Sequence, residues 1–263
     1  MGSFDFPILI CGDQFSKQLK GGTMTVLDFA ALARRVGVQG VEYRTRSWKD
    51  QAKELPIVRD QVREMGLIAT YGTFTTLFNR DAAEQQQLMQ DLEDARTLGA
   101  QLIRTLRGER PGQGPEDAHI WKASRAFLKR AEDIGMPVAL ENFGRAPGNS
   151  WQEVKQAIED LSSPVLGTLV DIGNYARQGF DVLEAIQQLK LWIRDAHLKD
   201  VKTTPEGSKS TYPGDGTLPY REILKAFADT GRRFPLTLEF SIDSDPEAEL
   251  KRGLEYVMRM ATA

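Results

Sequence analysis

Short apolar segments alternate with longer amphipathic segments along the whole chain. The short segments are rich in Val, Ile, Leu and Phe, and their lengths are typical of strands buried on both faces. There are eight of them, at residues 7–11, 38–43, 67–74, 100–106, 137–143, 165–173, 191–199 and 235–240. The pattern therefore predicts eight buried strands.

The longer segments place apolar residues every three or four positions, which is the period of a helix. They cover residues 25–37, 81–99, 119–135, 150–161 and 219–231. In the first, Val26, Phe29 and Val36 share one stripe, and all but 150–161 end on glycine, a common helix C-terminal cap. Ser150 and Glu153 have the spacing of a capping box. These segments are predicted to be helices between the strands.

Strands that alternate with helices indicate parallel βαβ units. Eight such units in 263 residues favour a closed barrel, which typically needs ~250 residues. The segment after the first strand, 12–22, lacks the glycine spacing of a dinucleotide-binding loop. No shift in composition divides the chain. We expect the α/β class and a single (β/α)₈ TIM barrel domain over residues 1–263.

One long insertion interrupts this alternation at residues 203–219. It is rich in Gly, Pro and Ser and follows the seventh strand. In a barrel it would lie at the end where the strands finish, so a mobile lid is one interpretation. A plain surface excursion explains the composition equally well, and both interpretations stay open.

Charge and cysteine content limit the binding partners and the cellular compartment that we expect. The chain has 34 Lys and Arg against 37 Asp and Glu, without a long block of either sign. This argues against a nucleic-acid or membrane surface. A single cysteine, Cys11, excludes an intramolecular disulfide, and its apolar context predicts burial. The N-terminus lacks a secretory pattern, and no apolar run is long enough to span a membrane. We expect a cytoplasmic protein.

Four residues with metal-binding side chains end four consecutive predicted strands. They are Glu141, Asp171, His197 and Glu239. In a parallel barrel these strand ends meet at one mouth, where three carboxylates would repel each other without a cation. Oxygen-rich ligation with one imidazole favours Mn²⁺, with Mg²⁺ or Co²⁺ as alternatives, over a structural zinc site. The pattern predicts one bound divalent cation.

A basic side chain could supply the positive charge instead of a metal. Arg104, Arg107 and Lys199 are the candidates, and each could equally form an ordinary salt bridge. The imidazole of His197 favours the metal interpretation. The other histidine, His119, lies in an amphipathic helix, where a solvated or capping role is expected.

Such a site suggests proton transfer next to a carbonyl. A cation with open positions can chelate a carbonyl and the neighbouring hydroxyl and stabilise an enediolate. Carboxylates on separate strands can then remove and return the proton. Tyr71, Phe74 and Trp192 could provide apolar walls for a sugar, although ordinary core packing is the simpler role for each.

Several motifs together resemble a known family. They are ALEN (139–142), VDIGN (170–174), HLKD (197–200), GDG (214–216) and LTLEF (236–240). In order and spacing they are similar to the sugar isomerase/epimerase branch of xylose-isomerase-like barrels. That branch includes ketose 3-epimerases, hydroxypyruvate isomerase and inosose-processing enzymes, and the resemblance covers most of the chain. It implies that Glu141, Asp171, His197 and Glu239 bind the metal, and that Glu141 and Glu239 are the acid/base pair.

The resemblance also indicates residues that contact the substrate. Glu42 matches an acidic residue often found at the end of strand two, although a salt bridge to Arg44 or Arg104 is an equal alternative. Arg104, Lys199 and Asn174 complete the predicted substrate contacts. Lys199 could stabilise an oxyanion or pair with Glu239, since strand alternation points it the same way as His197.

Three positions depart from the pattern of ketose 3-epimerases. Asn174 replaces a histidine, Thr203 replaces an arginine, and Pro147 replaces an acidic residue. The predicted metal ligands are therefore present, whereas the residues that hold the sugar differ. A lyase thus becomes a serious alternative to an epimerase.

The leading hypothesis is a metal-dependent isomerase or epimerase that acts on a small sugar or polyol ketone. The alternative is a metal-dependent lyase or dehydratase that eliminates a β-substituent from a keto-sugar or inosose, including cleavage of a 3-oxo-glycoside. Two histidines and no basic patch argue against the DNA-repair relatives of this barrel. A non-catalytic binding barrel is disfavoured by the complete ligand set. The apolar closing helix, 249–260, leaves a homodimer or homotetramer open.

Overall fold

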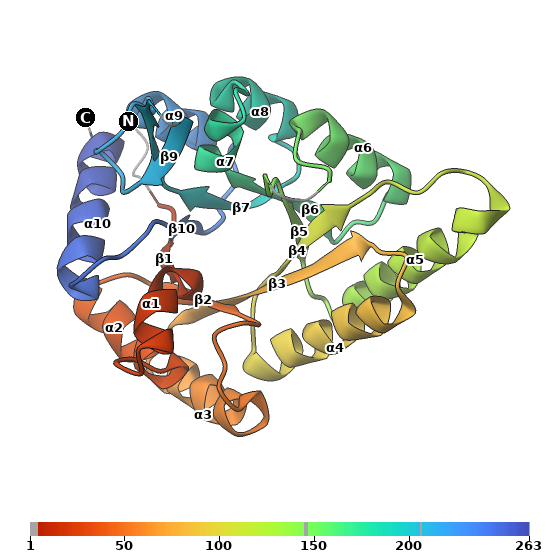
Figure 1. Ribbon diagram of the computed structural model, residues 1–263, viewed down its shortest axis with the longest axis horizontal. Coiled ribbons are helices and arrows are strands. Elements are labelled where there is room, and N and C mark those ends of the chain that lie inside the picture. The colour runs from red at the N-terminus through yellow and green to blue at the C-terminus, as the bar shows by residue number, and fades with distance from the viewer. Residues whose placement is uncertain (1–4, 145–146, 206, 263) are drawn as a thin grey trace.

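A computed structural model describes residues 5–144, 147–205 and 207–262. Eight parallel strands form a closed barrel in the order β1-β10-β7-β6-β5-β4-β3-β2 (Figure 1). The strands are β1 (Ile8–Cys11), β2 (Gly40–Arg44), β3 (Ile68–Phe78), β4 (Ile103–Gly108), β5 (Val138–Glu141), β6 (Leu166–Asp171), β7 (Ile193–Leu198) and β10 (Leu236–Leu238). The predicted strands and the predicted TIM barrel are confirmed.

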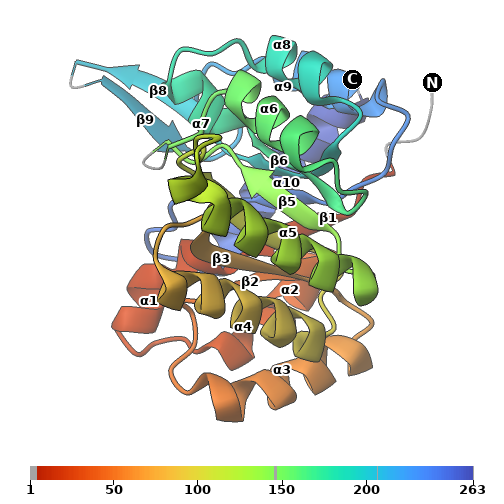
Figure 2. The ribbon, with the colours of Figure 1, turned by 90° about the vertical axis from the view of Figure 1, so that its right-hand side faces the viewer.

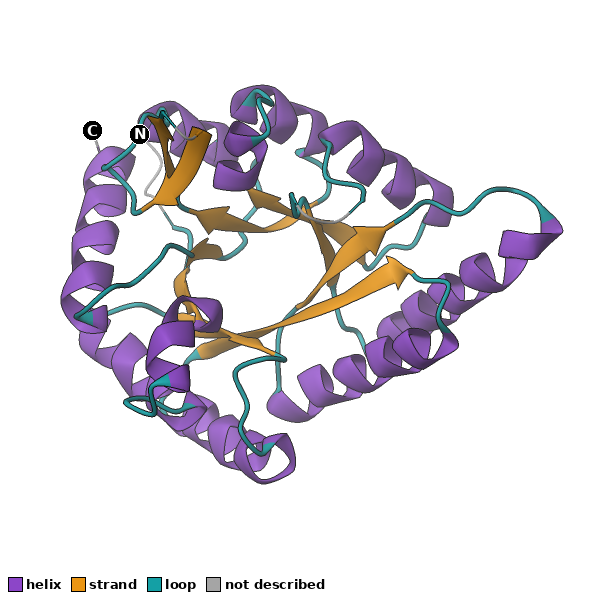
Figure 3. Ribbon diagram, viewed as in Figure 1, coloured by secondary structure: helices purple, strands orange, loops and turns teal. Residues whose placement is uncertain are grey.

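Helices surround the barrel as an outer ring (Figure 3). They are α2 (Phe29–Val36), α3 (Gln51–Glu64), α4 (Ala82–Leu98), α5 (Ala118–Asp133), α6 (Trp151–Leu161), α8 (Val182–Leu189), α9 (Tyr220–Ala228) and α10 (Pro246–Thr262). Shorter elements are η1 (Gly12–Phe15), α1 (Ser16–Lys20), η2 (Val26–Asp28), η3 (Pro115–Asp117) and α7 (Ile172–Arg177). The five helical segments predicted from periodicity are all helical, whereas α1, α3, α7 and α8 lie outside the segments that were predicted.

Local sequence signals account for the helix boundaries. Gly37 and Gly99 end α2 and α4 in the left-handed conformation, with φ of 90° and 78°, which costs glycine little. At the start of α6, the Ser150 hydroxyl accepts a hydrogen bond from the Glu153 backbone N–H, and the Glu153 side chain completes the capping box. These caps fix where each strand enters the barrel.

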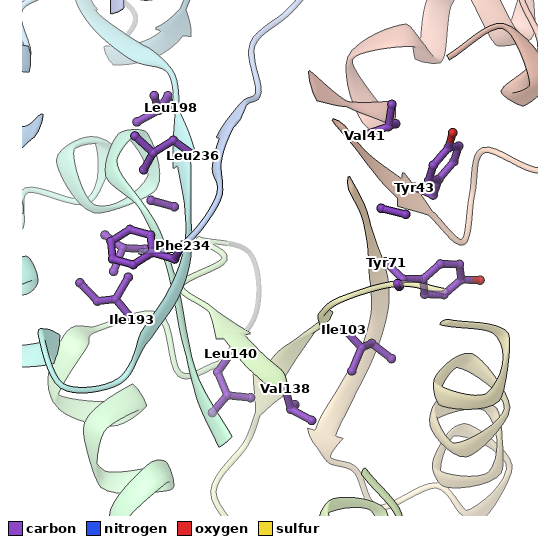
Figure 4. Close-up of a cluster of buried hydrophobic side chains, with 14 of the residues drawn as sticks. Val41, Tyr43, Tyr71, Ile103, Val138, Leu140, Ile193, Leu198, Phe234 and Leu236 are labelled. Carbon is purple, nitrogen blue, oxygen red and sulfur yellow. The ribbon is translucent and has the colours of Figure 1, made fainter. Parts of the chain in front are cut away.

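Residues along each strand alternate between two environments. In β2, Val41 and Tyr43 belong to the large apolar cluster that also contains residues of the surrounding helices (Figure 4). The residues between and after them, Glu42 and Arg44, are fully buried and form ion pairs inside the barrel. Because side chains alternate with a period of two, the strands have an apolar outer face and a polar face toward the barrel interior. The polar interior begins immediately below the barrel mouth.

The predicted insertion contains an antiparallel hairpin, β8 (Asp200–Thr204) and β9 (Gly207–Thr211). It projects from the same end of the barrel as α1 (Figure 2). The Asp200 carboxylate accepts hydrogen bonds from the backbone N–H groups of Val201, Gly214 and Leu218 and so anchors the insertion at its base. A lid and a plain surface excursion both stay open as interpretations of this insertion.

Within the described residues, no helix combines the length and the apolar character needed to cross a bilayer.

Candidate active site and metal centre

The structure brings the four predicted ligand residues together. Glu141 and Asp171 are the last residues of β5 and β6, His197 lies near the end of β7, and Glu239 directly follows β10. One ligand atom from each residue lies within 4.8 Å of the others. Asp171 and His197 are fully buried, whereas the Glu239 side chain is 16% exposed. The cluster therefore opens toward solvent on the side of Glu239.

The geometry around the His197 ring fits a shared ion. Nδ1 is buried and lies 3.4 Å from Glu239 Oε2, 3.7 Å from Glu141 Oε1 and 3.7 Å from Asp171 Oδ2. These separations are longer than ordinary hydrogen bonds. Ligands ~2.0–2.2 Å from one ion are roughly 3–4.4 Å apart, so the four atoms match the donor set of a Mn²⁺-type or Mg²⁺-type site.

Three basic side chains neutralise part of this acidic cluster. Arg104 Nε lies 2.8 Å from Glu141 Oε2, and Arg44 Nη2 lies 2.9 Å from Glu239 Oε1. Lys199 Nζ lies 2.6 Å from both Glu239 Oε2 and Asp171 Oδ2. The alternative in which basic residues supply positive charge is thus partly realised by Arg104 and Lys199. Arg107 instead pairs with Glu153 at 2.9 Å.

The pairing leaves a place for a further cation. Counting Glu42, four buried or nearly buried carboxylates face the three basic groups Arg44, Arg104 and Lys199. One negative charge is left over, and burial in a low dielectric makes an unbalanced charge costly. Protonation of His197 or binding of a divalent cation can balance it.

Glu42 contacts the Nε2 side of the His197 imidazole and orients the ring. Its Oε2 lies 3.3 Å from His197 Nε2, and its Oε1 lies 2.7 Å from Arg44 Nη2 and 3.3 Å from Cys11 Sγ. A carboxylate that accepts the Nε2 proton leaves the Nδ1 lone pair free for a metal. Of the two interpretations of Glu42, the salt bridge to Arg44 is present. A substrate contact by this fully buried side chain stays a prediction.

The charges around the imidazole and Glu239 shift their pKa values in opposite directions. Burial would lower the pKa of His197, but the Glu239 and Glu42 carboxylates outweigh it and hold the pKa well above its usual value. Burial would raise the pKa of Glu239, but Lys199, His197 and Arg44 hold it well below its usual range. Glu239 is therefore ionised and available to bind a cation or accept a proton.

A deeper acidic residue, Asp195, was not identified from the sequence. It lies two positions before His197 on β7 and is fully buried, and its carboxylate accepts hydrogen bonds from the Ala196 N–H and the Thr237 hydroxyl. Burial and the nearby Glu42 raise its pKa well above the usual value. Asp195, Glu42 and His197 also cluster, but the pairing of Glu42 with Arg44 makes this a poor second metal site. The spacing of two residues between Asp195 and His197 was the signal in the sequence that could have identified it.

Two asparagines fix the neighbouring ligands. The Asn142 amide exchanges hydrogen bonds with the backbone of Asp171, at 2.8 and 3.0 Å. Asp171 Oδ1 accepts from the Asn174 backbone N–H and so caps α7, while Asn174 Nδ2 lies 3.4 Å from Glu141 Oε1. Asn174 thus touches the cluster with a neutral amide.

Glycines leave room for two of the basic side chains. A Cβ at Gly72 would lie 2.6 Å from Arg44 Cδ, and one at Gly173 would overlap Lys199 Cγ. Gly173 is the glycine of the VDIGN segment. A side chain there would displace the ammonium group from the acidic cluster.

A cavity of about 650 Å³ lies at the mouth, within the size range of small-molecule sites. Glu239, Lys199 and Asn174 line it next to the cluster, and Phe74 and Phe143 supply apolar walls. Of the predicted aromatic walls, Phe74 lines the cavity, whereas Tyr71 is fully buried in the core. The arrangement can hold a small molecule that has one polar end against the carboxylates.

Comparison with known proteins places the chain in a family. The model of the xylose isomerase-like TIM barrel family matches residues 30–260, which include all four clustered residues. The chain belongs to this family. This confirms the resemblance inferred from the motifs.

Individual relatives are more distant. Fructoselysine 3-epimerase from Escherichia coli O157:H7 is 28% identical over 132 residues, which are 48% of this chain and 46% of the relative. The match therefore spans about half of that curated relative. A D-psicose 3-epimerase from Clostridium cellulolyticum H10 has a TM-score of 0.78 at 14% identity, covering 97% and 99% of the two chains. A probable 3-DHS dehydratase from Bacillus anthracis has a TM-score of 0.77 at 17% identity, covering 98% and 99%.

At these identities the likeness to solved structures establishes the shared fold. The same barrel carries both an epimerase and a probable dehydratase among them. Substrate and reaction must therefore be argued from the side chains of this chain.

Proposed function

We propose that the protein is a divalent-metal-dependent sugar isomerase or epimerase that moves a proton next to a carbonyl through an enediolate. The observation that carries this proposal is the buried Nδ1 of His197, which faces carboxylate oxygens of Glu141, Asp171 and Glu239 at 3.4–3.7 Å. Mn²⁺ is the favoured ion, with Mg²⁺ or Co²⁺ as alternatives. The family and the named 3-epimerase relatives support the same class of reaction.

Bound at these four residues, a divalent cation would polarise a substrate carbonyl and favour loss of the neighbouring proton. Glu239 is the ligand that also lines the cavity, and its lowered pKa keeps it ionised. It is therefore the first candidate to accept the proton. Glu141 is 2% exposed and is oriented by Arg104, and we assign it to the return of the proton on the opposite side.

Two other groups would assist the same step. The Lys199 ammonium lies at the cavity wall and can donate a hydrogen bond to a developing oxyanion. The Asn174 amide lines the cavity as well and can bind a hydroxyl. Arg104 is 1% exposed and bonded to Glu141, so its contribution would be to position that carboxylate. The hydrophobic walls at Phe74 and Phe143 would cover a sugar face and exclude water.

A lyase is the second candidate. Lys199 carries an ammonium group at the cavity wall, where it could protonate a leaving hydroxyl or alkoxide after the same first proton abstraction. The 650 Å³ cavity also has room for a β-substituent larger than a hydroxyl. These two observations favour elimination from a keto-sugar, an inosose or a 3-oxo-glycoside as the alternative outcome.

The test is deuterium uptake from D₂O into a panel of ketoses, inososes and 3-oxo-glycosides, followed by NMR with and without Mn²⁺. We expect Mn²⁺-dependent label next to a carbonyl with the wild-type chain, and its loss in Glu239→Gln. Rearranged sugars among the products identify an isomerase or epimerase, and eliminated products identify a lyase.

Total turnover is measured together with label, because a proton returned internally leaves no deuterium in the product. Glu255→Gln, an exposed change on α10, is the control for a loss of charge alone. Neither label nor product from any compound with a fully Mn²⁺-loaded chain would contradict the proposal.

A further inference from the structure

The lining of the cavity contains an excess of basic side chains. Lys17, Arg46, Arg177 and Lys199 line it, together with the acids Asp13 and Glu239. Lys199 and Glu239 pair with each other at 2.6 Å, and Lys17 pairs with Asp243 at 2.5 Å outside the cavity lining. Among the residues that the structure describes, Arg46 and Arg177 have no acidic partner within 4.0 Å.

Arg46 is held in place by an aromatic ring. Its guanidinium carbon lies 3.8 Å from the centroid of Phe74, which is itself part of the cavity wall. Stacking of this kind fixes the plane of the guanidinium and leaves its edge N–H groups free to bind an oxyanion in a bidentate manner. Arg46 follows β2, and Phe74 belongs to β3, so the pair lies on the strand-end side of the barrel.

Arg177 is tied to the metal-type cluster by a short helix. Asp171 caps the N-terminus of α7, and Arg177 is its last residue. Six residues of helix rise by about 9 Å, so this helix separates the two positions by roughly the length of a small sugar chain. An anion bound by Arg177 would therefore lie away from the carbons next to the carboxylate cluster.

The acid on the same rim, Asp13, interacts with Arg46 only at a distance, because it forms no ion pair with it. Asp13 lies in η1 and has no ion pair with Arg46 or Arg177 among the described residues. Lys17, in the next element α1, adds a positive charge to the same wall even when it is paired with Asp243. Arg46 and Arg177 are both exposed, so with a neutral sugar in the cavity their partner would be water.

We propose that the substrate carries a carboxylate or a phosphate at the end remote from the reacting carbonyl, and that Arg46 and Arg177 bind this group. The direction of the substrate rests on the proposed function, because the carbonyl is assigned to the Glu239 side of the cavity. The anion site itself rests only on the two arginines and the cavity. Carboxylate and phosphate have the same recognition chemistry, and the experiment separates them.

The test is calorimetric titration of the Mn²⁺-loaded chain with D-fructose, D-fructuronate and D-fructose 6-phosphate. These ketoses share the carbonyl end and differ in the charge at C6. We expect at least one of the two acids to bind about tenfold or more tightly than D-fructose, and Arg46→Gln and Arg177→Gln each to remove most of that preference. The tighter of the two acids identifies the source of the anion.

Arg125→Gln is the matched control. Arg125 also stacks on an aromatic ring, with its guanidinium carbon 5.6 Å from the Trp121 centroid, but it lines a separate cavity. Its loss should leave the preference unchanged. A preference that survives both Arg46→Gln and Arg177→Gln would mean that the metal captures the acid, and this result would overturn the proposal.

Equal binding of all three ketoses, or no binding of either acid, would also overturn it. These outcomes are independent of catalysis, since binding is measured without turnover. If the acids bind as expected but neither they nor any compound of the deuterium panel reacts, the proposed function fails and the anion site stands.

Discussion

The two halves of the barrel contribute mainly opposite charges to one site, and the exceptions are Glu42 on β2 and Lys199, which follows β7. Strands β5, β6, β7 and the residue after β10 supply Glu141, Asp171, His197 and Glu239. Strands β2 and β4 supply Arg44 and Arg104, which bind the outer oxygens of those acids. Neither half would be stable with its charges buried alone.

This difference in charge explains how the side chains of a metal-type cluster can be held in place before an ion binds. Each glutamate of the cluster uses one oxygen for an arginine and directs the other toward His197 Nδ1. The arginines therefore orient the ligands, and the unpaired charge is left at the position where an ion would lie. Removing one of the clustered acids should mainly impair the reaction, whereas removing one of the arginines should mainly impair stability.

The largest expected effect comes from the acidic half. Glu239→Gln removes the proposed base and one ligand, so the rate of Mn²⁺-dependent exchange should fall by roughly 10³-fold or more. The rate is measured by NMR in D₂O with the best compound of the panel. Exchange within threefold of wild type, with Glu255→Gln also unchanged, would exclude Glu239 from the reaction.

The next effect comes from the basic half. Arg44 is fully buried between Glu42 and Glu239, so Arg44→Met should destabilise the metal-free chain by about 3–5 kcal/mol. Urea unfolding, compared with exposed Arg63→Met on α3, measures this change. Mn²⁺ should restore part of the lost stability, because it supplies positive charge to the same acids. An unchanged unfolding midpoint would refute the charge balance described here.

Glu42 links the two halves, and its loss should have an intermediate effect. Glu42→Gln weakens the partner of His197 Nε2, so Mn²⁺ affinity should fall by about 10–100-fold. Calorimetry measures the affinity, and unfolding of the same sample separates it from a change in stability. Exposed Glu222→Gln on α9 should have wild-type affinity. Unchanged affinity in Glu42→Gln would mean that a group other than Glu42 determines the tautomer of His197.

The smallest expected effect is an increase in Mn²⁺ affinity, where the other changes lower a rate, a stability or an affinity. Lys199 Nζ lies 2.6 Å from two oxygens that face His197 Nδ1, so its ammonium competes with a cation for them. Lys199→Gln should raise Mn²⁺ affinity by roughly tenfold while it slows exchange, because a positive neighbour is removed. Lys202→Gln on the hairpin, where Lys202 pairs with Asp215, is the control. Weaker metal binding in Lys199→Gln would show that the ammonium supports the ligand set.

Much of the fold followed from the sequence, because period and capping are local signals. The strand positions and helix ends such as Gly37 depend on neighbours in the chain, and they were correct. The convergence of the four ligand residues followed from barrel geometry once the strand ends were assigned. The hairpin β8–β9 was not predicted, since its composition is that of a loop.

The basic half of the site was harder to predict. Arg44 appeared only as an alternative partner of Glu42, although its spacing of two residues on β2 places both side chains on one face. Its contact with Glu239 joins strands at opposite ends of the chain, and no local pattern encodes such a pair. Asp195 was missed although its spacing of two residues from His197 places both side chains on one face of β7, because the sequence does not show what role an acid at that depth would have.

The most direct measurement is a calorimetric titration of the metal-free chain with Mn²⁺, repeated for His197→Gln. The ring nitrogen is the one imidazole donor of the proposed ligand set, and the account predicts one ion per chain in the wild type and at least 100-fold weaker binding in the variant. Exposed His119→Gln should bind as the wild type does. No binding by the folded wild-type chain, or equal binding by His197→Gln, would contradict the metal centre.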